Sequence, residues 1–224
     1  MWRQRILTTL KISGPKNFGC LLDNARQVLN NLVDTAPFLY RYCLVGGSAL
    51  SLYLCHRKSE DLDFFTYGDT FDRLEIINYM RRFEHHEVLN DNNDQLDLLL
   101  DGIKVTFFNA KWDFLQPEKP SQLNIASLES IAAMKTNSLF VRAKYRDYYD
   151  LYFIVKNVMR LKDMFHCAQP VVSGLTYKLF SIALLYIDDI EDDSIAHLDP
   201  LEILSKKDIR RFFENQIRAD VGID

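Results

Sequence analysis

Residues 43–67, CLVGGSALSLYLCHRKSEDLDFFTY, decide the expected fold of this chain. The apolar run at 43–45 predicts a buried strand, and the glycine–glycine–serine sequence at 46–48 predicts a tight turn. A helix is expected from about Ala49, followed by a second strand. This strand–turn–helix–strand unit places a helix N-terminus beside a strand that carries acidic side chains.

The second strand is expected to carry two carboxylates, Asp61 and Asp63. Side chains at positions i and i+2 of a strand point to the same face, so the two acids repel each other unless a cation lies between them. A solvated edge strand with two surface acids is the alternative. The apolar neighbours Leu62, Phe64 and Phe65 argue against it, because acids on a buried strand need a partner. Mg²⁺ fits this oxygen-rich pair best.

The turn itself is expected to hold a phosphate. Gly46 and Gly47 let the backbone approach closely, and Ser48 either caps the following helix or donates its hydroxyl to a phosphate oxygen. An ordinary tight turn also needs small residues, so the turn alone does not decide the function. Arg57 lies shortly downstream, where it would pair with the acids or bind substrate phosphates.

The composition and the net charge of the chain exclude several classes of protein. The 224 residues are 48% hydrophobic and 12% aromatic, which excludes a disordered or fibrous chain. A net charge of −4 argues against a protein that mainly coats nucleic acid. No apolar stretch approaches a membrane span, and the four scattered cysteines form no C-x-x-C pair. We therefore expect a cytoplasmic protein with reduced thiols.

The pattern predicts an α+β chain with a domain boundary at the proline-containing segment 116–120. Residues 1–118 are expected to form a mixed sheet domain with flanking helices, and residues 119–224 an all-helical bundle. The sequence predicts helices at 20–34, 70–83, 127–142, 146–163, 171–190 and 205–219, and further strands at 85–89, 96–100 and 103–108, the last two joined by an Asp-Gly turn. Thr70 and Ser205 are the expected N-caps of two of these helices.

Two blocks of sequence resemble one family. GGSALSLYL at 46–54 and HRKSEDLDFF at 56–65 match the motifs GG-[ST]-AL-x-L and HR-x-S-x-D-[IL]-D-[LF]-F of the AbiEii/AbiGii abortive-infection toxins. These toxins belong to the DNA polymerase β-like nucleotidyltransferase superfamily. The second half is similar to the same family, with AAMK at 132–135 and RAKYRDYYDLY at 142–152 matching its lysine helix and its RD-x-x-D-L-Y motif.

The resemblance implies a nucleotidyltransferase fold and transfer of NMP from an NTP. It implies that Asp61 and Asp63 hold two Mg²⁺ ions, and that the segment of Gly46, Gly47 and Ser48 binds the nucleotide phosphates. By the same resemblance Lys135 is a catalytic lysine that faces the phosphates. Asp150 is implied as a base or a group that positions the acceptor.

One position departs from the superfamily pattern. A third carboxylate is usual on a later strand, and the matching strand here, 103–108, offers Lys104 and Thr106 instead. Asp97 on the neighbouring strand, or Asp150 from the helical half, would be the substitute.

The acceptor is expected to be the 3′ end of an RNA such as tRNA, guided by the cations Arg142, Lys144 and Arg146. The family setting implies the toxin of a bacterial toxin–antitoxin or phage-defence pair, with a separate antitoxin as partner. Two alternatives stay open: a degenerate member that binds nucleotide or a partner protein without transfer, and an enzyme that transfers NMP to a protein hydroxyl.

Overall fold

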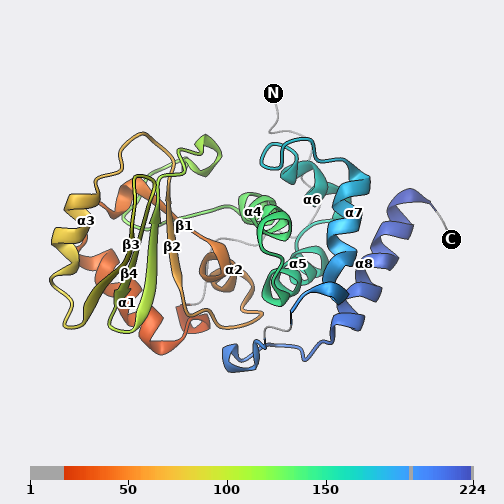
Figure 1. The fold of residues 1–224 in the computed structure, drawn as a ribbon, viewed down its shortest axis with the longest axis horizontal. Coiled ribbons are helices and arrows are strands. Elements are labelled where there is room, and N and C mark those ends of the chain that lie inside the picture. Colours follow the sequence, from red (N-terminus) through yellow and green to blue (C-terminus); the bar gives the residue numbers. More distant parts are fainter. Residues whose placement is uncertain (1–17, 192–193, 223–224) are drawn as a thin grey trace. The chain divides into compact units, whose positions relative to one another are not determined.

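The computed structural model describes residues 18–191 and 194–222, which divide into two compact units (Figure 1). The sheet unit contains residues 18–131 together with 198–200. The helical unit contains the other described residues from 132 onward. The division falls inside helix α4 (Leu128–Val141).

The sheet unit is built on a mixed sheet in the order β3-β4-β5-β2-β1-β6. Its strands are β1 (Tyr42–Val45), β2 (Leu62–Thr66), β3 (His86–Asp91), β4 (Gln95–Leu100), β5 (Ile103–Phe108) and β6 (Asn124–Ile125). β2 is parallel to β5 and β1 is parallel to β6, whereas the other neighbours are antiparallel. The expected α+β fold with a mixed sheet is therefore confirmed.

The two faces of the sheet differ in what they carry. The helices of this unit are α1 (Asp23–Thr35), α2 (Gly46–Leu54) and α3 (Arg73–Met80), and Figure 1 shows α3 and α2 on opposite sides of the sheet. The face toward α1 and α3 is an aromatic core in which Phe38, Tyr42, Phe64 and Phe107 are at most 1% exposed. Because side chains alternate along a strand, Asp63 points to the other face.

The helical unit is formed by the remainder of α4 and four further helices. These are α5 (Tyr145–Asn157), α6 (Leu161–Ala168), α7 (Tyr177–Leu185) and α8 (Lys206–Val221). Tyr148 and Tyr149 are fully buried, and their hydroxyls donate to the backbone carbonyls of Ala183 and Glu202. These rings therefore belong to the core of the unit.

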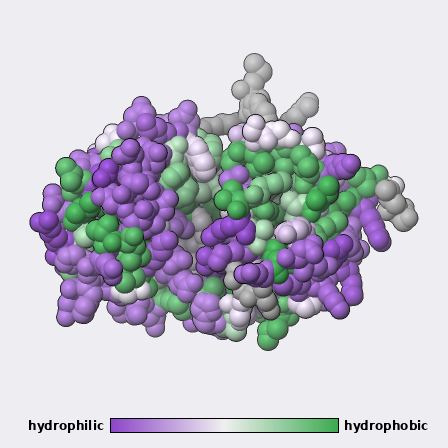
Figure 2. Space-filling view, in the orientation of Figure 1, coloured by the Kyte–Doolittle hydropathy of each residue, from purple (hydrophilic) through white to green (hydrophobic). Residues whose placement is uncertain are grey.

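Apolar side chains are exposed on part of the helical unit. Leu179 and Ile182 on α7 are 47% and 53% exposed, and Figure 2 shows apolar colour gathered over the α4–α7 part of this view. In the same view the sheet unit is mostly hydrophilic. Within the described part of the chain, none of the helices combines the length and apolarity that crossing a membrane requires.

Several expected element boundaries differ from the structure. The helix expected at 70–83 spans only Arg73–Met80, because the Asp72 side chain, not Thr70, accepts the backbone hydrogen bond from Glu75 that caps it. The helix expected at 146–163 is two helices, α5 and α6, since Arg160 is extended and caps the second one. α8 begins after Ser205 as expected, with Asp208 completing the capping box.

The remaining expected helices match in position more than in length. The helix expected at 20–34 is α1, and that expected at 171–190 is the shorter α7. The short strand β6 has no counterpart among the expected elements. It is held by the Asn124 side chain, which donates to the carbonyls of Tyr40 and Tyr42 at 2.8 and 3.1 Å.

The expectation of reduced thiols throughout is wrong for one pair of cysteines. A disulfide joins Cys20, in the 3-10 helix Phe18–Cys20, to Cys55, the residue that ends α2. The fold brings the two Cα atoms to 5.3 Å across a sequence separation of 35 residues, which no spacing motif reveals. Cys43 and Cys167 are not part of this disulfide, and burial raises the pKa of Cys43 to about 12.

Candidate functional site: a glycine turn beside two carboxylates

Gly46 allows a carboxylate to lie directly against the backbone. It directly follows β1 as the first residue of α2, so this helix begins before Ala49, its expected start. Its φ of +70° is one that residues other than glycine rarely adopt. A Cβ atom at Gly46 would lie 2.7 Å from Oδ2 of Asp63. The glycine is therefore needed twice, for its backbone conformation and for the space that the Asp63 carboxylate occupies.

Gly47 allows a guanidinium to approach in the same way. A Cβ atom there would lie 2.7 Å from Nη2 of Arg57 and 3.3 Å from the Ser59 hydroxyl. Arg57 is only 4% exposed, and its Nη1 donates to the carbonyl of Lys58 at 2.9 Å. A buried cation beside the first turn of α2 adds to the positive end of the helix dipole, and both favour an anion.

Ser48 ties the segment before β2 to the start of α2. Its hydroxyl donates to the backbone carbonyl of Asp61 and accepts from the Ser59 hydroxyl at an Oγ–Oγ distance of 2.9 Å, and the side chain is almost completely buried. In this state the hydroxyl positions the strand that carries the acids. Contact between Ser48 and a phosphate stays a prediction.

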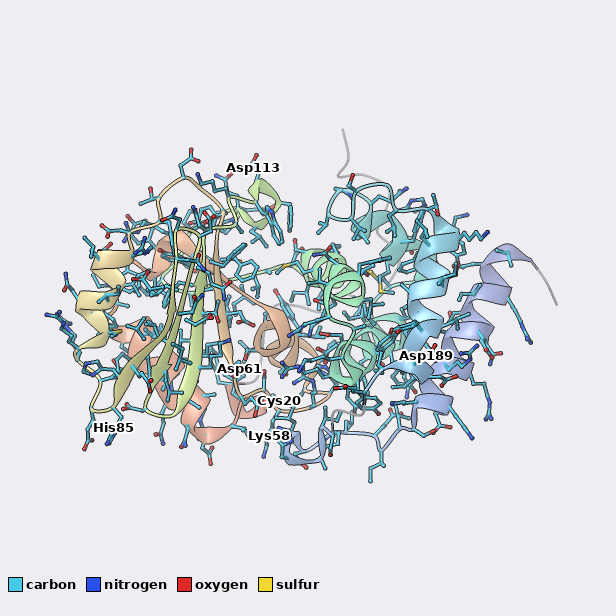
Figure 3. All side chains as sticks on the ribbon, in the orientation of Figure 1. Cys20, Lys58, Asp61, His85, Asp113 and Asp189 are labelled. Carbon is cyan, nitrogen blue, oxygen red and sulfur yellow. A yellow bond between two sulfur atoms is a disulfide. The ribbon has the colours of Figure 1, made fainter. Side chains whose placement is uncertain are left out.

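Asp61 and Asp63 are half-buried and lie at the N-terminal end of β2. Contrary to expectation, only Asp63 is within the strand, because β2 begins at Leu62. Asp63 pairs in register with Val45 on β1 and with Thr106 on β5. Figure 3 shows Asp61 at one end of the strands, near Cys20 and Lys58.

The residues present fit a divalent cation that is shared with a substrate. No three acidic, histidine or cysteine side chains converge on one point in residues 18–191 and 194–222. Mg²⁺ is commonly held by one or two carboxylates, with water and substrate phosphates as the other ligands. Asp63, which lies against Gly46, and Asp61, two residues before it, supply that kind of donor set, and Arg57 lies against Gly47.

The position expected to carry a third carboxylate is occupied by a hydroxyl that is bonded to one. Thr106 Oγ1 donates to Oδ1 of Asp97 at 2.7 Å, and the two residues are 8% and 7% exposed. The other oxygen of Asp97 accepts from Gln95 at 2.8 Å and lies 3.8 Å from the Lys104 ammonium. Asp97 thus lies one strand further from Asp63 than Thr106 does.

Lys135 and Asp150, the other two expected site residues, belong to the helical unit. The Lys135 ammonium lies 2.6 Å from Asp150 Oδ2 and 3.0 Å from Asp147 Oδ1, and all three residues are at most 4% exposed. Burial alone raises the pKa of Asp147, but attraction to Lys135 and to Arg142 outweighs it, so the pKa of this carboxyl lies below its ordinary value. The structure brings Lys135 and Asp150 together, in a different unit from Asp61 and Asp63.

The three cations expected to contact RNA surround the start of α5. Arg142 is paired with Asp147 at 3.1 Å and is 43% exposed at its side chain. Lys144 is the N-cap residue of α5, and Arg146 lies in its first turn, half-buried. Asp147 is therefore an acid in the first turn of α5 that pairs with Arg142.

Sequence reasoning assigned no role to Ser59 and Gln95, which hold Ser48 and Asp97 in place. Ser59 is the serine of the motif HR-x-S-x-D, whereas Gln95 has no motif of its own. Gln95 is a strand residue two positions before Asp97, so the period of a strand would have placed both on one face. The contact of Ser59 with Ser48 depends on how the loop after α2 folds back, so the motif alone does not predict it.

Comparisons with known proteins show the family of this chain. The family model described as "Nucleotidyl transferase AbiEii toxin, Type IV TA system" matches residues 100–219, more than half of the chain. A protein of Aquifex aeolicus, described as uncharacterized, is 30% identical over 183 residues, covering 78% of this chain and 89% of its own length.

Solved structures show the same fold at low sequence identity. MenT4, a nucleotidyltransferase toxin from Mycobacterium tuberculosis, is 17% identical with a TM-score of 0.60, and the likeness covers 87% of this chain and 82% of MenT4. A structure described as a putative nucleotidyltransferase from Helicobacter pylori is 19% identical with a TM-score of 0.54, covering 89% and 94% of the two chains. The chain therefore belongs to the AbiEii family of nucleotidyltransferase toxins of type IV toxin–antitoxin systems.

Proposed function

We propose that this protein transfers NMP from an NTP to the 3′ end of an RNA such as tRNA, with Mg²⁺ held by Asp61 and Asp63. One observation carries the proposal: the Asp63 carboxylate and the Arg57 guanidinium lie against two consecutive glycines at the N-terminus of α2. This arrangement sets a cation ligand and an anion ligand side by side, which suits a metal-bound triphosphate. Family membership supports an NTP substrate, a divalent metal and an antitoxin.

Different residues of the sheet unit would bind different phosphates of the NTP. Arg57 and the N–H groups at the start of α2 would hold the β- and γ-phosphates, whereas Asp61 and Asp63 would face the α-phosphate. When bound, Mg²⁺ supplies positive charge that stabilises the departing pyrophosphate. We place two ions there, as the resemblance implies.

In the proposed reaction the acceptor hydroxyl oxygen forms a bond to the α-phosphorus. The bond from that phosphorus to the oxygen bridging to the β-phosphorus breaks, and pyrophosphate leaves with the bonding electrons. The hydroxyl proton passes to a base, for which the resemblance proposes Asp150. Lys135 keeps its proposed role as a phosphate contact. The ion pair between Lys135 and Asp150 supports a structural role for them equally well. Stability measurements distinguish the structural role from the catalytic one.

Thr106 favours a second candidate function. A hydroxyl stands where the superfamily places an acid, and this supports a nucleotide-binding protein that does not transfer. A third candidate transfers NMP to a protein hydroxyl, and the acidic pI of about 5.8 favours it, because RNA binding relies on phosphate contacts. We also propose that the protein acts in phage defence and in the cytoplasm.

A transfer assay distinguishes these candidates. Each of four α-phosphate-labelled NTPs is incubated with Mg²⁺, total tRNA and total protein, with Asp63→Asn as the blank. Label on RNA that disappears in the variant supports the proposal. Label on protein alone favours the third candidate, and bound NTP without any transfer favours the second.

A further inference from the structure

The face of the sheet that carries Asp63 also carries a group of aromatic rings. Phe65 lies two residues after Asp63 on β2, so the two side chains point to the same face. Phe108 pairs with Phe65 in register, just as Thr106 pairs with Asp63. With Trp112 and Phe114, these two phenylalanines form what we call the aromatic shelf.

The rings of the shelf lie in contact with one another. The ring centre of Phe65 is 5.0 Å from that of Phe108 and 5.8 Å from that of Trp112. Trp112 stacks on Phe114 at 5.2 Å with 26° between the planes. The rings therefore form a continuous aromatic surface from β2 to the segment after β5.

The segment that carries Trp112 is fixed in place. The backbone N–H groups of Lys111 and Trp112 donate to the side chain and the carbonyl of Thr66, at 3.0 and 3.4 Å. The next residues form a short 3-10 helix (Asp113–Leu115) that is anchored by Leu115, which is 3% exposed. The shelf is thus held at the C-terminal end of β2.

Exposure separates this shelf from an ordinary core cluster. The aromatic cluster on the other face of the sheet is closed, whereas Phe114 is 43% exposed and Phe65, Phe108 and Trp112 are half-buried. Packing within the unit leaves ring surface available. Aromatic rings presented in this way are how proteins stack the bases of single-stranded nucleic acids, and this works with any base.

The shelf and the glycine turn lie at opposite ends of β2. Val45 pairs with Asp63, so the turn that begins at Gly46 lies beside the N-terminal end of the strand, toward Asp61. Figure 3 shows Asp61 at one end of the strands and Asp113, which adjoins Trp112, at the other. A step of two residues along a strand is about 7 Å, so Asp63 lies between the two features.

The order of these features along β2 indicates whether the shelf receives the base of the acceptor or the base of the NTP. In an in-line displacement the attacking oxygen approaches opposite the leaving pyrophosphate. If the pyrophosphate is held at the glycine turn, the acceptor approaches from the end of β2 that carries the shelf. Asp113, which lies between Trp112 and Phe114 in the sequence and is exposed, adds negative charge that disfavours a triphosphate at that end.

We infer that the aromatic shelf of Phe65, Phe108, Trp112 and Phe114 binds the terminal unpaired base of a single-stranded RNA acceptor. The inference rests on the proposed function, because it uses the triphosphate position at Gly46 and Gly47. It names the substrate as a nucleic acid with a free, unstacked end and disfavours a protein hydroxyl.

Equilibrium binding tests this inference separately from activity. The probe is a single-stranded RNA of about eight nucleotides with a free 3′ hydroxyl and a fluorescent label on its 5′ end, and its anisotropy on titration with the full chain gives the affinity of every variant. Trp112 fluorescence is followed separately in a Trp2→Phe chain that keeps Trp112. We expect quenching by the RNA, and a loss of RNA affinity of about 5- to 150-fold in Trp112→Ala. Trp112→Phe should retain most of the affinity, since it keeps a ring for stacking.

Two controls keep the result interpretable. Leu74→Ala removes an apolar side chain that is 71% exposed on α3, and its RNA affinity should not change. Mg²⁺-NTP affinity should be the same in Trp112→Ala as in wild type, which also shows that the variant is folded.

Two results would overturn the inference. The first is RNA affinity unaffected by Trp112→Ala. The second is quenching by NTP alone with NTP affinity lost in the variant, which would assign the shelf to the incoming base. Absence of NMP transfer with RNA binding at the shelf intact would instead count against the proposed function.

Discussion

Thr106 donates its hydroxyl hydrogen to the Asp97 carboxylate at 2.7 Å, directly across the sheet from Asp63. The hydroxyl oxygen of Thr106 thereby keeps its lone pairs while its proton is committed to Asp97. The face of the sheet therefore carries a row in which an acid, a hydroxyl and a second acid stand on consecutive strands. The second acid is present in this chain, but a threonine separates it from Asp63.

Thr106→Val should destabilise the sheet unit by about 1–3 kcal/mol, because it leaves a buried carboxylate oxygen of Asp97 without its donor. Thr106→Ser keeps the hydroxyl and should lose much less stability. Urea denaturation of both variants measures the difference. Equal stability of the valine and serine variants would show that the hydrogen bond contributes nothing.

Gly46→Ala should abolish Mg²⁺-dependent NTP binding, because the new methyl group meets Asp63 Oδ2 at 2.7 Å and the backbone φ of +70° is strained for alanine. Gly47→Ala should weaken NTP binding at least about tenfold by displacing Arg57, since one or two charge-assisted hydrogen bonds are lost. Gly68→Ala is the matched control, because a Cβ atom added there would meet nothing within 4 Å. NTP titration by calorimetry, with circular dichroism to check folding, distinguishes the three. Unchanged binding in Gly46→Ala would contradict the placement of the site.

Lys135→Met should destabilise the helical unit by about 3–5 kcal/mol, because two buried carboxylates, Asp147 and Asp150, lose the cation between them. Lys156→Met is the control. Its partner Glu202 is 33% exposed at the side chain and Lys156 is 39% exposed, so the loss should be below about 1 kcal/mol. Thermal denaturation measures both. If Lys135→Met lost as little stability as Lys156→Met, Lys135 would be available for the proposed phosphate contact.

The same ion-pair cluster gives a pH dependence with a definite sign. The pKa of Asp147 is lower in the folded chain than its ordinary value of 3.8, so the unfolded chain takes up a proton first on acidification. The stability contributed by Asp147 is complete above pH 3.8 and is lost as the pH falls through the lowered folded pKa. Asp147→Asn should flatten this part of the stability–pH curve, measured by urea denaturation.

Reduction of the Cys20–Cys55 disulfide should lower the stability by about 3–4 kcal/mol, which is the chain-entropy expectation for a loop closed across 35 residues. Thermal denaturation with and without a thiol reductant tests this. The Cys20→Ser variant should match the reduced wild type and no longer respond to reductant. Cys167→Ser, which removes a thiol outside the disulfide, should respond to reductant as wild type does.

Sequence alone predicts the mixed sheet and the residues at its centre. The strand at Ile103–Phe108 and the cap at Ser205 lie where the sequence predicts them, because a hairpin turn and a capping box are local signals. The helix expected at 146–163 divides in two, since tertiary packing decides where α5 ends and α6 begins. The Cys20–Cys55 disulfide depends on contacts across the fold and has no local signal.

For the candidate site, the sequence supplies residue types and the structure supplies their contacts. The motif indicates glycines near carboxylates, but only the fold shows that Gly46 makes room for Asp63 and Gly47 for Arg57. Likewise, Thr106 looks like a missing acid in the sequence, and its bond to Asp97 depends on strand register. Register between distant strands is set by the whole core, so it could not be predicted from the motif.

The Mg²⁺ dependence of NTP binding tests the site at Asp61 and Asp63 most directly. Binding of a non-hydrolysable NTP is titrated with and without Mg²⁺ in wild type, Asp61→Asn, Asp63→Asn and the neighbouring control Glu60→Gln. We expect wild type and Glu60→Gln to bind in a Mg²⁺-dependent way, and both aspartate variants to lose that dependence. Mg²⁺-dependent binding that survives in Asp61→Asn and Asp63→Asn would contradict the assignment of these carboxylates.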